Sequence, residues 1–98
     1  MTVNEAKKIA IVLANLTFEY PCNGDELLIV DDFIKESAHG WFFSYNTKSF
    51  LTTRDYKCML MGNGPIVVPK DGSPAELFPS AYSMDKAIVI FEERFKHT

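Results

Sequence analysis

Short turns separate the apolar runs of this chain, and they limit the folds open to it. Gly, Pro, Asn and Ser gather at residues 21–25, 37–40, 62–65 and 71–74, where they favour turns and disfavour continued helix or strand. A connection between neighbouring parallel strands needs about a dozen residues or more. These turns are shorter, so the sequence predicts an antiparallel sheet.

Four apolar or alternating segments are expected to form its strands. Residues 27–34 begin with a β-branched and aliphatic run, and residues 40–46 alternate so that Trp41, Phe43 and Tyr45 share one face. We expect these two strands to form a hairpin joined at His39 and Gly40. The last two strands, residues 66–68 and 75–78, are expected to pair across the turn between them.

A helix is predicted at each end of the chain. Thr2 and Glu5 have the spacing of a capping box before a helix at about residues 3–17. Its apolar side chains recur at helical spacing: Ala6, Ile9, Ala10, Leu13 and Leu16. Ser83 can cap a second helix whose apolar stripe is Met84, Ala87, Ile88, Phe91 and Phe95. The predicted class is α+β, with an N-terminal helix, an antiparallel sheet of about four strands and a C-terminal helix, both helices packed on one face.

Length and charge narrow the function. The 98 residues fit one domain, residues 1–98, and 47% of them are hydrophobic, enough for one core. The net charge of −3 comes wholly from the first half, so no basic face suits a nucleic-acid backbone. No apolar run approaches the roughly 20 residues that span a bilayer, and Glu5 lies where a signal peptide is basic or apolar. We expect a cytosolic protein that binds neither nucleic acid nor membrane.

The histidines and cysteines do not form a recognisable catalytic or metal-binding motif. Cys22 and Cys58 are isolated, a spacing that supports neither a zinc site nor a disulfide, so reduced thiols are expected. His39 and His97 have no nucleophile or carboxylate at a catalytic spacing. A Cys58–His39 dyad is an alternative, but we favour a turn histidine beside a partly buried cysteine.

The carboxylates and the glycine-rich turn have simple structural interpretations. Asp31 and Asp32 would point to opposite faces of a strand and could not act as a pair. Glu92 and Glu93 are expected on the solvated side of the last helix. The turn at 62–65 lacks the Lys-Ser/Thr ending of a phosphate loop. We therefore predict no catalytic residue, no cofactor and no metal, and the chain is not expected to be an enzyme.

Trp41 is the bulkiest residue to place. Burying it would stabilise the fold by about 1.5 to 3 kcal/mol or more. The alternative is an exposed anchor for a protein partner, because Trp and Tyr are enriched at interface hot spots. We favour the core.

Three segments together resemble the immunity protein 35 family. They are Gly40-Trp41-Phe42-Phe43-Ser44-Tyr45-Asn46, Ser49-Phe50-Leu51-Thr52-Thr53, and the run from Leu60 to Gly72 that contains Gly62-Asn63-Gly64-Pro65. The similar family pattern is a Gly-Trp-aromatic-Phe strand, a Phe-Leu step, a Gly-Asn-x-Pro turn and an apolar strand ending in Lys/Asp-Gly. The resemblance covers about residues 33–95. The polar segment Arg54–Cys58 departs from it.

The resemblance implies a small bacterial protein that binds and neutralises a polymorphic or contact-dependent toxin encoded by a neighbouring gene. A heat-induced, chaperone-like holdase is the alternative that the family also suggests. The shared residues look like determinants of the fold: Gly40, Trp41, Gly62, Asn63, Gly64 and Pro65.

The residues that contact the partner are expected to lie outside those shared with the family. The acidic hairpin, with Asp31, Asp32 and Glu36, could meet a basic toxin cleft, although a solvated hairpin is the simpler interpretation. Asp55 and Tyr56 add an exposed aromatic that could enter a pocket. A dedicated inhibitor is favoured over a general chaperone, and over a small enzyme for which no convergent titratable cluster is visible.

Overall fold

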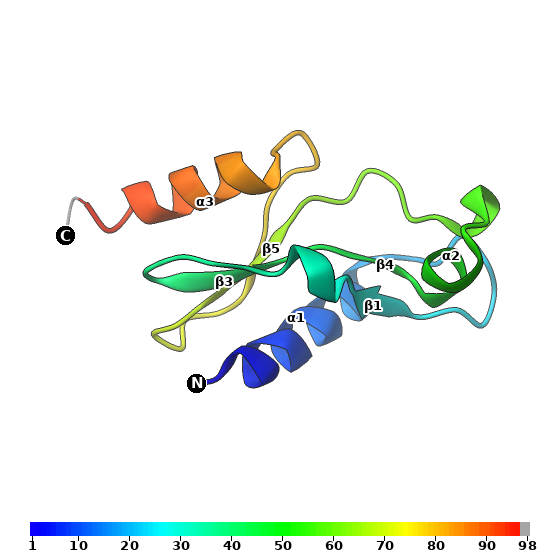
Figure 1. The fold of residues 1–98 in the computed structure, drawn as a ribbon, viewed down its shortest axis with the longest axis horizontal. Helices are drawn as coiled ribbons and strands as arrows, with labels where there is room; N and C mark the ends of the chain where they lie inside the picture. The colour runs from blue at the N-terminus through cyan, green and yellow to red at the C-terminus, as the bar shows by residue number, and fades with distance from the viewer. Residues whose placement is uncertain (97–98) are drawn as a thin grey trace.

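The chain begins and ends with the two predicted helices, and the strands lie between them together with one further short helix (Figure 1). The structure is a computed structural model and describes residues 1–96. Its elements are α1 (Val3–Thr17), β1 (Leu27–Ile29), η1 (a 3-10 turn, Asp31–Phe33), β2 (Lys35–Glu36), β3 (Gly40–Phe43), β4 (Tyr45–Thr47), α2 (Lys48–Thr53), η2 (a 3-10 turn, Tyr56–Cys58), β5 (Ile66–Pro69), β6 (Glu76–Leu77) and α3 (Met84–Glu93). The α+β class is confirmed. His97 lies outside the described residues.

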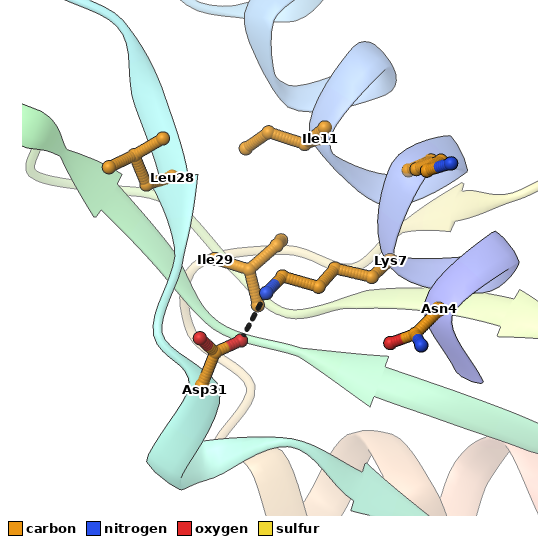
Figure 2. Close-up of a pocket in the computed structure, with 7 residues that line it drawn as sticks. Asn4, Lys7, Ile11, Leu28, Ile29 and Asp31 are labelled. Carbon is orange, nitrogen blue, oxygen red and sulfur yellow. Dashed lines mark ion pairs between the residues drawn. The ribbon is translucent and has the colours of Figure 1, made fainter.

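The strands form two antiparallel sheets. The larger has four strands in the order β2-β3-β5-β6, and β1 pairs with β4 in the smaller. β1–β4 and β2–β3 are two parts of the predicted hairpin, but the pairing shifts by three positions between them, the length of η1. Asp31 and Asp32 therefore lie in a turn, where a strand was predicted. Figure 2 shows Asp31 reaching the ammonium of Lys7 on α1.

α1 buries a face made of alanines. The capping box is present, since Glu5 N donates to Thr2 Oγ1 and Thr2 N donates to Glu5 Oε1. The fully buried residues of the helix are three alanines, Ala6, Ala10 and Ala14. Their small side chains let the helix lie close to the strands, so Ile9 and Leu16 remain exposed. Both residues follow the helical spacing seen in the sequence, but they do not belong to the buried face.

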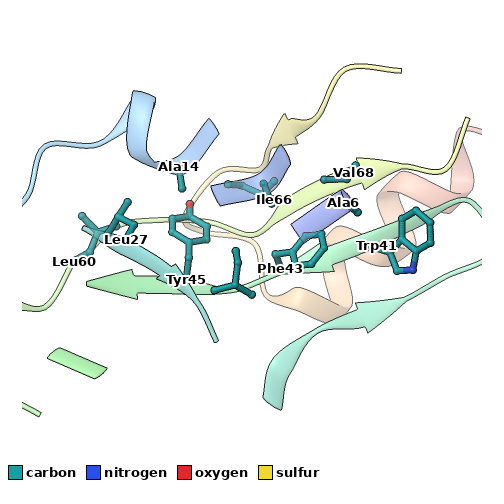
Figure 3. Close-up of a cluster of buried hydrophobic side chains, with 11 residues drawn as sticks. Ala6, Ala14, Leu27, Trp41, Phe43, Tyr45, Leu60, Ile66 and Val68 are labelled. Atoms are coloured by element: carbon teal, nitrogen blue, oxygen red, sulfur yellow. The ribbon is translucent and has the colours of Figure 1, made fainter. Parts of the chain in front are cut away.

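The four-stranded sheet carries a buried layer on each face. On one face α1 covers a cluster that includes Trp41, Phe43, Tyr45, Ile66 and Val68 (Figure 3). On the other, Ala87 and Phe91 of α3 pack against Phe42 and Val67. Neighbouring strand residues point to opposite sides, and β3 and β5 are apolar at every position. Both faces of the sheet must therefore be covered, and α1 and α3 lie on opposite faces (Figure 1). The prediction that the two helices pack on one face is wrong.

Trp41 belongs to the core, as favoured from the sequence. Only 7% of its surface is exposed, and the ammonium of Lys70 lies 5.1 Å from the ring centroid. Gly40 beside it packs closely under α3, because a Cβ there would lie 3.0 Å from side-chain atoms of both Phe91 and Val67, and those side chains would have to shift by a few tenths of an ångström.

The turn at residues 62–65 precedes β5 of the four-stranded sheet and is hydrogen-bonded to β4 of the smaller sheet. Gly62 has a φ of +74°, which a residue with a side chain rarely adopts. A Cβ on Gly64 would lie 2.0 Å from the carbonyl oxygen of Phe78. The Asn63 amide donates to the carbonyl of Tyr45 at 3.1 Å, and the Tyr45 hydroxyl donates to the carbonyl of Gly64 at 2.7 Å. Burial raises the pKa of that phenol, so it remains a donor.

Pro65 and the C-terminal helix complete the second layer. The carbonyl of Pro65 accepts from Phe78 N at 2.8 Å, next to the predicted pairing of β5 with β6. Ser83 Oγ accepts from Lys86 N, so the predicted cap of α3 is confirmed. α3 is thus fixed at its start by this cap and along its length by the buried Ala87 and Phe91.

Candidate partner-binding surface

The acidic hairpin presents less free charge than its sequence suggests. Asp31 pairs with Lys7 at 2.5 Å, and Glu36 pairs with Lys70 at 2.5 Å. The hydrogen bond from Lys70 and its positive charge hold the pKa of Glu36 below its ordinary value. Asp32 is exposed, and among the described residues no cation lies within ion-pair distance of it. Two of the three proposed acidic contacts are therefore already neutralised within the chain.

Asp55 and Tyr56 lie in a separate region of the surface. Asp55 caps η2, because its Oδ1 accepts from Lys57 N at 3.0 Å. Tyr56 is 75% exposed, and its ring lies 5.7 Å from that of Phe50 between centroids. Figure 1 places α2 and the following turn at one end of the long axis, whereas η1 lies near the middle. The structure does not bring the two sets of predicted contact residues together.

Residues 48–58, called the aromatic lobe from here on, contain a helix that the sequence did not reveal. The sequence predicted no helix in this segment, yet Lys48–Thr53 forms α2. Thr47 Oγ1 accepts from Phe50 N and caps the helix. Its threonines and serine have weak helix propensity, so the fold around it and this cap decide its structure.

The loop at residues 18–26 fixes the first end of the aromatic lobe. Asp25 Oδ1 accepts from Ser49 N at 3.2 Å, and Lys48 N donates to the carbonyl of Glu26 at 2.8 Å. The loop is itself bound to α1 through Asn15, whose amide group bonds both the N–H and the carbonyl of Leu27. The start of the lobe is therefore joined to the N-terminal helix through a chain of hydrogen bonds.

A disulfide fixes the other end. Cys22 of the same loop is bonded to Cys58, with a Cα–Cα distance of 5.3 Å. The expectation of two reduced thiols is wrong, and so is the Cys58–His39 alternative, because the Cys58 sulfur is already bonded. Isolated cysteines 36 residues apart give no sequence signal of their pairing; only the fold brings the loop and the lobe together.

An open groove lies between α1 and β1, near η1 (Figure 2). It has a volume of about 530 Å³, and its lining includes Ile11, Leu28 and Ile29. The ion pair between Lys7 and Asp31 crosses it (Figure 2). The groove is therefore lined by both apolar and polar residues, with Asn4 and Lys8 among the polar ones, and its Lys7–Asp31 charge pair is already satisfied.

The solvent side of α1 carries an apolar stripe. It comprises Ile9, Val12 and Leu16, one and two turns apart, and Leu16 is 81% exposed. Exposed apolar patches of this kind mark interaction surfaces more often than isolated apolar residues do. The stripe is a further candidate contact surface, and the predicted site did not include it.

Glu92 joins α3 to the turn between β2 and β3. Its carboxylate accepts from the hydroxyl of Ser37 at 2.5 Å and from the backbone N–H of His39 at 3.0 Å, and it contacts His39 Nδ1 at 2.6 Å. Partial burial would raise the pKa of Glu92, but these hydrogen bonds outweigh it and hold the pKa below its ordinary value. The prediction of a solvated Glu92 is wrong, whereas Glu93 is exposed and pairs with Lys96.

This cluster does not have the geometry of a catalytic triad. The hydroxyl of Ser37 donates to the carboxylate of Glu92, and His39 meets the same carboxylate. A triad needs the imidazole between the hydroxyl and the carboxylate. The ring of His39 is also stacked on Phe95, with centroids 3.9 Å apart. The three residues act as a clasp between helix and turn.

Two kinds of feature are not found in the part of the chain that the structure covers. Within residues 1–96, no group of three or more His, Cys, Asp and Glu side chains is placed to hold a metal ion. In the same range no helix is both long and apolar enough to cross a membrane.

Comparison with known proteins agrees with the resemblance seen in the sequence. The profile of the family described as immunity protein 35 matches residues 4–91. The chain belongs to the immunity protein 35 family. The match begins within α1, so the N-terminal helix is part of the family pattern. Immunity proteins act on a protein partner, and the family thus implies a binding role for this member.

One curated relative is similar over part of its length. The protein YrhB of Escherichia coli (strain K12), described as uncharacterized, is 27% identical over 55 residues, which are 56% of this chain and 58% of YrhB. The match thus spans little more than half of that relative. No solved structure matches this immunity protein 35 member.

Proposed function

We propose that this protein binds and neutralises a cognate protein toxin, encoded by a neighbouring gene, in the cytosol of the cell that makes the toxin. The observation that carries the proposal is the family match over residues 4–91. Inhibition would be stoichiometric and would work through a protein–protein interface, without catalysis and without a cofactor.

The size of the surface supports this function. A standard interface buries about 800 Å² on each partner, and the accessible surface of this chain is 6045 Å². One end or one face of the molecule can supply such an area while the two buried layers remain intact. The polar groups of the Ser37–Glu92–His39 cluster are used to hold the fold, which favours a binding role over a chemical one.

The proposed contact residues fall into two patches. Asp31, Asp32 and Glu36 form one on the hairpin, and Asp55 and Tyr56 form the other on the aromatic lobe. In the hairpin patch Asp32 is the carboxylate that keeps its charge unpaired among the described residues. The two patches make separate predictions about which substitutions weaken toxin binding.

A tagged pull-down from the native cell tests the function, with sizing and mass spectrometry of the eluate. We expect one partner at fixed stoichiometry, the product of the neighbouring gene. Co-expression should then protect cells from that toxin, and a tagged acidic protein of similar size should recover none of it. A toxin that neither binds the protein nor is neutralised by it would contradict the proposal.

A heat-induced holdase is the second candidate, and the α1 stripe is the observation that favours it. Exposed Ile9, Val12 and Leu16 could hold partly unfolded clients. A holdase should bind a hydrophobic dye in its native state and suppress aggregation of several heated proteins, and Leu16→Glu should abolish both effects. No dye binding and no suppression would remove this candidate.

A further inference from the structure

We propose that the aromatic lobe, residues 48–58, is the surface that contacts the toxin, and that it fits an apolar pocket rimmed by carboxylates. The inference rests on the proposed function and makes it specific. It selects one of the two predicted patches and reverses the expected charge of the partner.

The lobe presents an exposed aromatic side chain that is supported by a second ring. Tyr56 is 75% exposed, and its ring lies against Phe50. A tyrosine gives a large contact area for few rotatable bonds, which is why it is enriched at hot spots. Tyr56 can therefore enter a pocket at little cost in side-chain entropy.

The unpaired charge of the lobe is positive, opposite to that of the chain as a whole. Residues 48–58 contain Lys48, Arg54 and Lys57 against one acid, Asp55, while the net charge of the chain is −3. Among the described residues no carboxylate lies within ion-pair distance of Arg54 or Lys57. Lys57 follows Tyr56 directly, and Arg54 lies two residues before it with Asp55 between them, so the unpaired charges around the ring sum to +1. Charge complementarity then calls for carboxylates around the pocket that receives the ring.

In the hairpin patch, two of the three carboxylates are already paired with a lysine of the same chain. Asp31 and Glu36 already have a lysine each at 2.5 Å. A basic toxin residue would have to compete with those lysines, whereas Arg54 and Lys57 have no carboxylate to give up. The available charge of the molecule thus favours the lobe.

The lobe is also ordered before any partner arrives. Asp25 and Glu26 hold its first end. Its last end is held by the disulfide to Cys22 and also by the Thr47 hydroxyl, which donates to the carbonyl of Cys58 at 2.6 Å whether or not the disulfide forms. Arg54 adopts a φ of +60° between α2 and η2, and its guanidinium carbon lies 5.3 Å from the centroid of the Phe50 ring. A surface ordered in advance loses less entropy on binding.

The test measures binding kinetics with a catalytically inactive form of the toxin encoded beside this gene, on the intact disulfide-bonded protein. Tyr56→Ala should weaken affinity about 10-fold or more, mainly through faster dissociation. The double reversal Arg54→Glu with Lys57→Glu should slow association about 10-fold at low salt, and the effect should shrink at high salt.

Matched controls change similar residues elsewhere. Phe33→Ala removes another exposed aromatic, 58% exposed on η1, and Lys8→Glu with Lys35→Glu reverses two other exposed lysines. Both should alter the kinetics less than about threefold. Unchanged thermal unfolding of every variant would show that the fold is intact.

The outcomes separate the inference from the function. If the toxin binds the wild-type protein and the lobe variants behave like the controls, the lobe is not the contact surface and the inhibitor function stands. If charge reversal at Asp31 and Asp32 slows association and the lobe reversal does not, the hairpin is the contact surface. If the toxin does not bind the wild-type protein, the proposed function fails and the inference fails with it.

Discussion

The sheet between α1 and α3 and the aromatic lobe are held by different interactions. In β3 and β5 every residue is buried, and their side chains pack against a helix on each face. In the lobe only Cys58 is buried, and the backbone is held by caps, hydrogen bonds to residues 25–26 and one disulfide. Burial stabilises the first region, whereas the second is shaped by directed bonds, so its exposed side chains can change at little cost to the fold.

The largest loss of stability should come from the sheet. Phe42→Ala removes a fully buried ring that packs edge-on against Phe91, with centroids 5.6 Å apart, and should lower the free energy of unfolding by about 3 to 5 kcal/mol. Val89→Ala on the exposed side of α3 is the control and should cost about 0.5 kcal/mol or less. Urea unfolding followed by circular dichroism measures both. Equal effects would show that this face is not a packed core.

Breaking the disulfide should loosen the lobe and leave the sheet folded. The cross-link closes a loop with a sequence separation of 36 residues, for which the chain-entropy model gives about 3 to 4 kcal/mol. Cys22→Ser with Cys58→Ser, or reduction of the wild-type protein, should lower stability by up to that amount. Thiol titration of the unfolded, unreduced protein should find no free cysteine; two free thiols would contradict the cross-link. Thiols stay reduced in most cytosols. The same titration, on protein whose free thiols are blocked before the cells are lysed, shows whether Cys22 and Cys58 are bonded in the cell.

Replacing either glycine of the 62–65 turn with alanine should lower the free energy of unfolding, but for different reasons. Gly64→Ala introduces a Cβ that meets the Phe78 carbonyl at 2.0 Å, so the backbone must move, at about 2 to 3 kcal/mol. Gly62→Ala meets no atom within 4 Å and costs only the positive φ, about 1 kcal/mol. Denaturant unfolding of the two variants measures the difference. A larger loss at Gly62 than at Gly64 would contradict the close approach of the two chain segments.

The Glu92 clasp should make stability depend on acid. Its lowered pKa means that the carboxylate stabilises the fold above about pH 4.5, the ordinary value, and that this contribution disappears as pH falls through the lower folded pKa. Glu92→Gln should cost about 1.5 kcal/mol at pH 7 and flatten the loss below pH 4.5. Glu93→Gln is the matched control on an exposed neighbour. Parallel pH–stability curves for the wild type and Glu92→Gln would refute the clasp.

The smallest effect on stability is expected at Tyr56, the residue that we propose contributes most to toxin binding. Tyr56→Ala removes a ring that is 75% exposed and should change the free energy of unfolding by about 0.5 kcal/mol or less. Thermal unfolding measures this change. A loss above about 2 kcal/mol would mean that the ring supports the lobe, and its role in binding would then need the charge reversals as the independent test.

Local patterns predicted the elements that depend on local chemistry. The capping box of Thr2 and Glu5, the Ser83 cap and the alternation of Trp41 with Phe42 are set by neighbouring residues, and the structure has all three. The alternation was also the sign that both faces of the sheet need cover, because Phe42 is as apolar as Trp41. The prediction that both helices pack on one face did not take this alternation into account.

The features that were missed depend on distant residues. The Cys22–Cys58 bond, the contact of Glu92 with Ser37 and the pairing of Asp31 with Lys7 join segments that only the fold brings together. No spacing rule reports such contacts. The acidic hairpin looked available in the sequence because the lysines that neutralise it lie on α1 and beyond β5.

Hydrogen exchange of the protein alone and bound to the inactive toxin tests the account most directly. In the free protein, amides of β3 and β5 should exchange most slowly and those of residues 48–58 faster, because one region is buried and the other is held at its ends. Toxin should slow exchange mainly at residues 48–58. Protection centred on η1 and β2, with the lobe unchanged, would contradict the account.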